Sequence, residues 1–96
     1  MSKTYVIAGN REQAEDWITS KIASMISNSQ NLMYVARSNF IYVDSPLKLW
    51  GIQDPHGVFI GTWRERKDIK LVVETLFQRC IHVNRQLEMI RREVNR

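Results

Sequence analysis

The fold is decided by the stretch Thr4-Tyr5-Val6-Ile7-Ala8-Gly9-Asn10-Arg11-Glu12-Gln13. Residues 4–8 form a short apolar run rich in β-branched and aromatic side chains, which is typical of a buried strand. Gly9 ends this run. Asn10 then has the side chain of a helix N-cap, and Gln13 stands three residues later as its capping-box partner. We therefore predict a strand over residues 4–8 that leads directly into a helix over about residues 11–27.

A second junction of the same kind lies fifty residues further on and reads Val58-Phe59-Ile60-Gly61-Thr62-Trp63-Arg64-Glu65. Both junctions consist of a strand, a glycine, a small polar residue and then Arg-Glu at the start of a helix. If the two strands are parallel, both junctions lie at one edge of the sheet, where helix N-termini offer free N–H groups to an anion. The candidate anion-binding residues are Gly9, Asn10, Arg11, Gly61, Thr62 and Arg64. The alternative is that the glycines only let the backbone turn and the polar residues cap helices.

Further strands are expected between these junctions. Residues 32–37 and 40–43 predict two strands joined by a tight turn, residues 47–52 predict another strand, and residues 58–60 predict a clear one. The order of strands and helices is that of an α/β protein. We expect a small, Rossmann-like mixed sheet of three to five strands with two helices, the C-terminal one long and extended.

The last third of the chain predicts one uninterrupted helix over about residues 65–95, because no Gly or Pro occurs there. Apolar residues recur along it at alternating spacings of four and three, as in a heptad repeat. These residues are Ile69, Val73, Leu76, Cys80, Val83, Leu87, Ile90 and Val94. A helix of this length spans about 45 Å, whereas a six-residue strand spans about 20 Å. We therefore expect a single domain, residues 1–96, from which residues 83–96 project as a helical arm.

The apolar seam on this arm needs a covering surface. A second copy of the protein covers all of it, and the helix over residues 11–27 covers part of it in the alternative arrangement. We expect a homodimer that associates through Val83, Leu87, Ile90 and Val94.

The charge balance favours an anionic partner. The chain has 14 Lys and Arg against 10 Asp and Glu, a net charge of +4, with a pI of about 9.6. The arm contributes Arg85, Arg91, Arg92 and Arg96 as candidate contacts to a protein partner or to nucleic acid. Tyr34 and Tyr42, with Arg37 nearby, are a candidate platform for stacking single-stranded bases. The alternative for these aromatic residues is ordinary packing within the domain.

The sequence predicts no catalytic, metal or cofactor site. It has one cysteine and two histidines, which do not form a ligand set with a known metal-binding spacing. We expect Cys80 to be a core thiol. No apolar run approaches the roughly 18–20 residues that cross a bilayer, and no signal peptide is recognisable. We therefore expect a soluble cytoplasmic protein that does not bind membranes.

Two stretches, YVIAGNREQAEDWI (residues 5–18) and GVFIGTWRERKDI (residues 57–69), resemble small uncharacterised α/β proteins encoded by bacteriophages. They cover about a third of the chain. The stretch LKLWGIQDPHGVFIGTW (residues 47–63) is similar in rhythm to an inner strand region of phage-type ATPase cores. However, it has no Gly-x-x-x-x-Gly-Lys-Ser/Thr loop, and Gly61-Thr62 stands where that family has acidic metal ligands. The resemblance implies a Rossmann-like sheet without ATP hydrolysis and a role in binding a host or viral macromolecule.

We therefore interpret the sequence as that of a non-enzymatic interaction module. It self-associates through its C-terminal helix and binds a macromolecular partner, for example as a phage accessory or host-modulating protein in the host cytoplasm. One alternative is a nucleic-acid-binding protein that uses the basic C-terminal helix. Another is a small ligand-binding protein or enzyme with its site at the Gly9/Gly61 edge.

Overall fold

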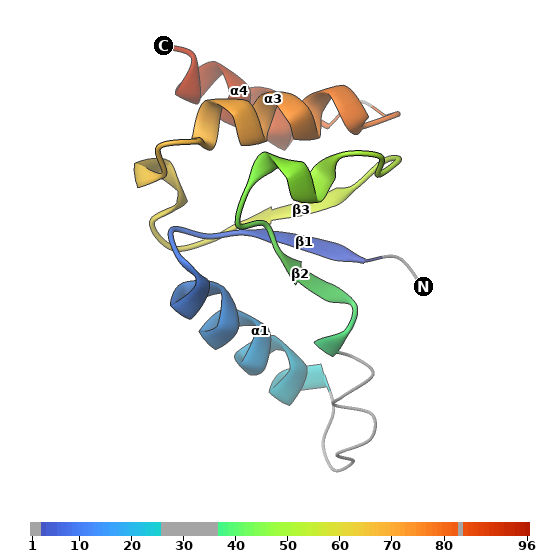
Figure 1. Ribbon diagram of the computed structural model, residues 1–96, viewed down its shortest axis with the longest axis vertical. Coiled ribbons are helices and arrows are strands. Elements are labelled where there is room, and N and C mark those ends of the chain that lie inside the picture. The colour runs from blue at the N-terminus through green and yellow to red at the C-terminus, as the bar shows by residue number, and fades with distance from the viewer. Residues whose placement is uncertain (1–2, 26–36, 83) are drawn as a thin grey trace.

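The computed structural model describes residues 3–25, 37–82 and 84–96, and these form a small α/β fold (Figure 1). The elements in chain order are β1 (Thr4–Ile7), α1 (Arg11–Met25), β2 (Phe40–Tyr42), the 3-10 turn η1 (Pro46–Leu49), β3 (His56–Phe59), the 3-10 turn η2 (Trp63–Glu65), α3 (Ile69–Arg79) and α4 (Arg85–Val94). The strands predicted at residues 4–8, 40–43 and 58–60 are confirmed.

The sheet has the strand order β2-β1-β3, and all three of its described strands are parallel. Thr4 of β1 pairs with Phe40 on one side and with His56 on the other. The expectation of a mixed sheet is therefore wrong for the described strands. Parallel neighbours need connections that cross a face of the sheet, and these crossings place helices on both faces.

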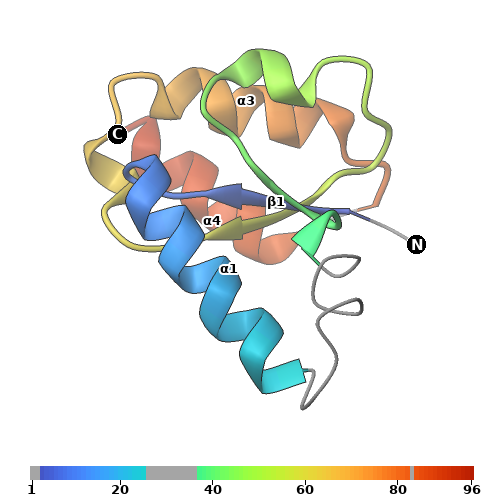
Figure 2. The same ribbon diagram turned by 60° about the horizontal axis from the view of Figure 1, so that its bottom comes forward.

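The two faces of the sheet have separate apolar layers. On one face, Val6 and Ala8 pack with Ala14, Ile18 and Ile22 of α1. Tyr5 and Ile7 point to the opposite face, where α3 and α4 cover them. Figure 2 brings α1 to the front of the sheet with α3 and α4 behind it. Because successive side chains of a strand point to opposite faces, β1 contributes to both layers and is buried on both sides.

The start of α1 follows the sequence prediction. Asn10 is its N-cap, and its Oδ1 accepts a hydrogen bond from the backbone N–H of Gln13 at 2.9 Å. The side chain of Gln13 does not return to the Asn10 backbone as in a capping box, since its Oε1 accepts from the Gly9 N–H at 3.0 Å. The described part of α1 extends to Met25.

The prediction of a strand over residues 47–52 is wrong. Pro46 begins the 3-10 turn η1, in which a fixed φ and a missing N–H are tolerated at the first position. Gly51 follows with φ of +75°, which bends the chain away from an extended path. Residues 32–36 of the other expected strand lie outside the described residues, and Arg37 has helical backbone.

The prediction of one long helix over residues 65–95 is also wrong, because the helix is interrupted between Arg79 and Arg85. Asp54, in the turn before β3, binds the chain where α3 ends: its N–H donates to the Arg79 carbonyl at 2.8 Å, and its Oδ1 accepts from the Ile81 N–H at 3.1 Å. Asn84 then caps α4, since its Oδ1 accepts from the Leu87 N–H at 3.1 Å. These bonds replace the helical bonds that a continuous helix would make.

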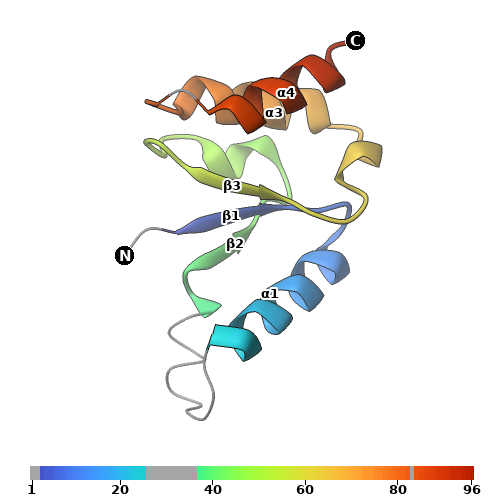
Figure 3. The same cartoon turned by 180° about the vertical axis from the view of Figure 1, so that it is seen from behind.

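After the break, α4 folds back beside α3 and runs in the opposite direction (Figure 3). Leu87 is only 3% exposed and belongs to the core that contains Ile7 and Leu76. Ile90 and Val94 pack against the same core. Residues 84–96 therefore do not project as an arm, and three of the four residues expected to mediate self-association are used inside the molecule. The side chain of the fourth, Val83, lies outside the described residues.

Replacing Leu87 by Ala should lower the free energy of unfolding by about 3 kcal/mol, because it removes a buried side chain from the core. Met89 lies two residues further along the same helix and is 69% exposed. Its replacement by Ala should change the free energy by less than about 0.5 kcal/mol. Urea denaturation of the two variants measures the difference. Equally small losses would mean that α4 does not pack on the core.

Candidate functional site

Gly9 and Gly61 lie next to each other at the carboxyl-terminal edge of the sheet, as predicted for two parallel strands. β2 and β3 lie on opposite sides of β1, so the strand order reverses direction at β1. The crevice at the carboxyl ends of the strands next to such a reversal is the usual place for a ligand in an open α/β sheet. Here the place is taken by Gln13. Its Oε1 accepts from the backbone N–H groups of Gly9 and Thr62, both at 3.0 Å, and its Nε2 donates to Thr62 Oγ1 at 2.9 Å.

The two glycines are required by this close packing. A Cβ on Gly9 would overlap Thr62 Oγ1, and a Cβ on Gly61 would overlap Gln13 Oε1. Gly61 also has φ of +58°, which other L-residues rarely adopt. The side-chain amide of Gln13 therefore fills the space between the junctions and occupies two of the N–H groups that an anion would have used.

The two arginines of the predicted anion site are also engaged. Arg11 pairs with Asp44 at 3.5 Å and lies 5.2 Å from the centre of the Tyr42 ring. Arg64 pairs with Glu93 of α4 at 3.0 Å. The second junction leads into a three-residue 3-10 turn, so no long helix N-terminus forms there. The geometry gives Gly9, Asn10, Arg11, Gly61, Thr62 and Arg64 structural roles and does not support an anion site.

Arg66 is the residue at this edge that the sequence reasoning missed. Its side chain is only 5% exposed, and its Nη1 donates to the carbonyls of Ala8 at 3.1 Å and Val43 at 2.6 Å. Its Nε and Nη2 bind both carboxylate oxygens of Asp68 at 2.9 Å. Arg66 thus connects the segments that directly follow β1 and β2. The Arg-x-Asp spacing was the only sequence signal for it.

The described members of the predicted base-stacking platform, Arg37 and Tyr42, take part in contacts within the domain. Phe40 and Tyr42 share a face of β2 and pack in the α1 layer. Trp17 of α1 meets the Phe40 ring edge-on at 5.9 Å. Arg37 forms an ion pair with Glu15 of α1. Tyr34 lies outside the described residues.

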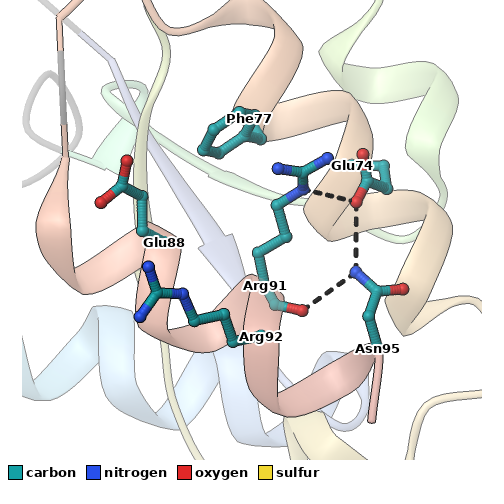
Figure 4. A pocket seen from close by; sticks show the side chains of 6 residues that line it. All are labelled: Glu74, Phe77, Glu88, Arg91, Arg92 and Asn95. Carbon is teal, nitrogen blue, oxygen red and sulfur yellow. Dashed lines mark hydrogen bonds and ion pairs between the residues drawn. The ribbon is translucent and has the colours of Figure 1, made fainter.

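A shallow hollow of about 510 Å³ lies between α3 and α4 (Figure 4). Across it, Glu74 Oε1 accepts from Arg91 Nε at 2.7 Å and from Asn95 Nδ2 at 3.2 Å. The Arg91 guanidinium lies 4.3 Å from the centre of the Phe77 ring. Arg91 therefore joins the two helices. The structure gives it an ion pair with α3, and its contact with a partner stays a prediction.

The ionisation of Glu74 reflects this pairing. The hydrogen bond from Arg91 lowers the pKa of Glu74 below its ordinary value, although partial burial opposes this effect. The same hydrogen bond raises the pKa of Arg91. The carboxylate of Glu74 and the guanidinium of Arg91 neutralise each other, so the hollow offers little net charge to a ligand.

Two of the three other predicted arginines lie on the outward side of α4, and the third, Arg96, lies just after the helix. Arg85, Arg92 and Arg96 are all exposed, and within residues 3–25, 37–82 and 84–96 none forms an ion pair. Met89 lies among them and is 69% exposed. In Figure 4 the Arg92 side chain points away from Glu74, unlike that of Arg91. We call Arg85, Met89, Arg92 and Arg96 the basic face.

Metal-binding and thiol chemistry have little basis in the described part of the chain. No group of three or more His, Cys, Asp or Glu side chains there could hold a metal ion. Cys80 is half-buried against the core, and burial raises the pKa of its thiol, which disfavours the reactive thiolate. None of the described helices is both long enough and apolar enough to cross a membrane.

Comparison of the chain with protein-family models, with curated proteins and with solved structures finds no match. The resemblance to bacteriophage proteins stays a prediction.

Replacing Arg66 by Ala should lower the free energy of unfolding by about 3 kcal/mol, because the carbonyls of Ala8 and Val43 and the carboxylate of Asp68 lose their donor. The neighbouring Lys67 is exposed, so Lys67→Ala should change it by less than about 0.5 kcal/mol. Chemical denaturation of both variants provides the comparison. An Arg66→Ala loss as small as that of Lys67→Ala would remove Arg66 from this structural role.

The Glu74–Arg91 pair should make stability depend on pH in acid. Because the pKa of Glu74 is lowered in the folded state, its contribution is present above the usual glutamate pKa of about 4.3 and is lost as pH falls through the lower folded value. Glu74→Gln should therefore flatten the fall in melting temperature below about pH 4.3. Glu65→Gln, at an exposed position without an ion pair in the described structure, is the control. If both variants keep the wild-type pH profile, the pair does not contribute.

Proposed function

We propose that the protein is a non-enzymatic interaction module that binds an acidic protein surface through the basic face of α4. The observation that carries this proposal is which of the nine arginines form ion pairs with carboxylates. Five of them are neutralised by ion pairs with carboxylates. These five are Arg11, Arg37, Arg64, Arg66 and Arg91. The other four have no such partner in the described part of the chain: three belong to the basic face, and the fourth is Arg79 at the end of α3.

The geometry of α4 gathers these residues into one surface. Met89 lies four residues after Arg85 and three before Arg92, so these three are neighbours on the helix. Arg96 lies two residues beyond the end of α4. The apolar side of the helix, with Leu87 and Ile90, points into the core. Arg85, Met89 and Arg92 are therefore held by the packing of α4 and extend over about 11 Å of helix axis, and Arg96 follows the end of the helix.

The composition of the face favours a protein partner over nucleic acid. Arginine and methionine are enriched in protein–protein interfaces, whereas lysine is depleted, and the face contains no lysine. Three arginines would also neutralise few phosphates, compared with the roughly six to ten contacts of a nucleic-acid-binding protein whose affinity falls steeply with salt. On the resemblance to small bacteriophage proteins, the partner that we propose is a host or viral protein.

Nucleic acid is the second candidate. It is favoured by the net charge of +4 and by the ability of arginine to bind phosphate in a bidentate manner. Three contacts to duplex phosphates would give a slope of roughly −2.7 in a plot of log affinity against log salt concentration.

Reversing the basic face with Arg85→Glu, Arg92→Glu and Arg96→Glu tests the proposal. Fluorescent polyglutamate and a fluorescent DNA duplex serve as probes in anisotropy titrations at several salt concentrations. We expect the wild type to bind polyglutamate more tightly than DNA and the variant to lose at least about tenfold in affinity for polyglutamate, because three attractive contacts become repulsive. Exposed charges contribute about 0–1 kcal/mol each, so the variant should still fold.

The matched control carries Lys48→Glu, Lys70→Glu and Arg79→Glu, three exposed residues outside α4. It has the same change in net charge and should keep its affinity for polyglutamate within about threefold. Equal losses in the two variants would show that net charge alone drives binding, which contradicts a site on α4. Tighter binding of DNA, lost in the α4 variant only, would replace the first candidate with the second.

A further inference from the structure

We infer that α4 is exchanged between two copies of the chain when the protein is concentrated. In the exchanged dimer, α3 and α4 of each copy form one continuous helix, and α4 of each copy covers the core of the other. This inference does not depend on the proposed function, because it concerns the core side of α4 and not the basic face.

The apolar stripes of α3 and α4 are in phase with each other. The stripe of α3 consists of Ile69, Val73 and Leu76, and that of α4 consists of Leu87, Ile90 and Val94. Leu76 and Leu87 lie eleven residues apart, which is close to three turns of an α-helix. In one continuous helix, both stripes would therefore lie along the same side. The connection in this structure is not helical at residues 80–82 and 84, so it does not require this phase. The exchanged dimer does require it, because one side of a single helix must cover two cores.

The interruption between the helices depends on polar contacts and not on a helix-breaking residue. Residues 80–84 contain no Gly or Pro. Asp54 Oδ1 accepts from the Ile81 N–H, and Asn84 Oδ1 accepts from the Leu87 N–H, both at 3.1 Å. The Asp54 N–H donates to the Arg79 carbonyl. A continuous helix satisfies the same backbone groups internally. The interrupted and continuous forms therefore differ by few interactions.

A straight helix carries α4 away from its own core. Residues 69–94 as one helix extend about 39 Å, whereas α3 alone extends about 16 Å. In this structure α4 lies beside α3 on the same face of the sheet (Figure 3). Straightening one chain alone would expose Leu87, now 3% exposed, and the core surface that it covers, which is unfavourable.

The occupant of this surface is therefore α4 of a second copy. It has the same residues as the helix that leaves, so it makes the same contacts with the core. Exchange of an identical element produces a dimer without a new core interface.

The dimer also covers an apolar residue that this structure exposes. Ile81, just after α3, is 60% exposed. It lies four residues after Phe77, whose ring contacts the Arg91 guanidinium of α4. Residues four apart lie on one side of a helix, so in the continuous helix Ile81 faces the antiparallel helix of the other copy.

Two matched double variants test the interruption. Asp54→Gly with Asn84→Ala removes both side-chain acceptors, and glycine tolerates the φ of +52° at this position. Asp54→Asn with Asn84→Asp keeps both acceptors. The proteins are refolded from urea at about 1 mM chain, because dimers are favoured by concentration. Light scattering should show dimer in the wild type and at least about threefold more dimer in the first double variant than in the second.

His82→Pro tests whether the dimer needs the continuous helix. Residue 82 is not helical in this structure, whereas proline within a helix removes a hydrogen bond and clashes with the preceding turn. This variant should stay monomeric under the same refolding conditions.

A charge exchange across the α3–α4 contact tests where α4 lies in the dimer. Glu74→Arg and Arg91→Glu each place two like charges at the ion pair between these helices. When the two variants are refolded together, an exchanged heterodimer has an opposite-charge pair at both of its contacts. Native mass spectrometry should therefore show at least about fivefold more heterodimer than the two homodimers together.

The matched control exchanges the charges of the Arg11–Asp44 pair, which does not involve α4. A mixture of Arg11→Glu and Asp44→Arg should give heterodimer and total homodimer in about equal amounts, as random pairing does, because this pair stays within one copy.

Three results would overturn the inference. The first is a protein that stays monomeric both in the wild type and in the Asp54→Gly, Asn84→Ala variant. The second is a dimer that persists in His82→Pro. The third is a mixture of the Glu74 and Arg91 variants with no more heterodimer than the Arg11–Asp44 control. The last two would show that the copies associate through another surface.

Discussion

Pairing of β1 on both of its sides, with two parallel neighbours, is the constraint on which the other features depend. Because both neighbours run in the same direction as β1, each connection must cross a face of the sheet, and β1 becomes buried on both faces. The same pairing brings the ends of the strands to one edge, where Gln13 and Arg66 bind backbone groups from more than one segment. Among the described strands it also leaves β3 paired on one side only.

The parts of this fold that local sequence determines could be predicted. The apolar runs at residues 4–8 and 58–60 and the Asn10 cap indicate their elements without tertiary information. The break at residues 80–84 could not be found in this way, because it contains no Gly or Pro and the apolar spacing continues across it. The hydrogen bonds that make the break come from Asp54, in another part of the chain. Apolar residues at alternating spacings of four and three are consistent with two helices that pack on one core as well as with one long helix.

Only part of the candidate site could be predicted, because contacts between distant segments of the chain decide the rest. The meeting of Gly9 and Gly61 follows from strand direction, but only the structure shows the Gln13 amide between them. Likewise, the sequence places Arg91 and Arg92 side by side and gives both the same charge. Which of them faces α3 depends on how the two helices pack. The arginine that faces α3 forms an internal ion pair, and the other has no ion-pair partner in the described structure.

The central position of β1 has a consequence for the chain during its synthesis. β1 precedes β3 by some fifty residues, and ribosomes add about 5–20 residues per second. For roughly 3–10 s, therefore, the strand that is buried on both faces in the folded protein has no partner on its β3 side. An unpaired apolar strand is a template for pairing with another chain. Chaperone capture of the nascent chain in this interval would protect Tyr5, Val6 and Ile7 until β3 emerges.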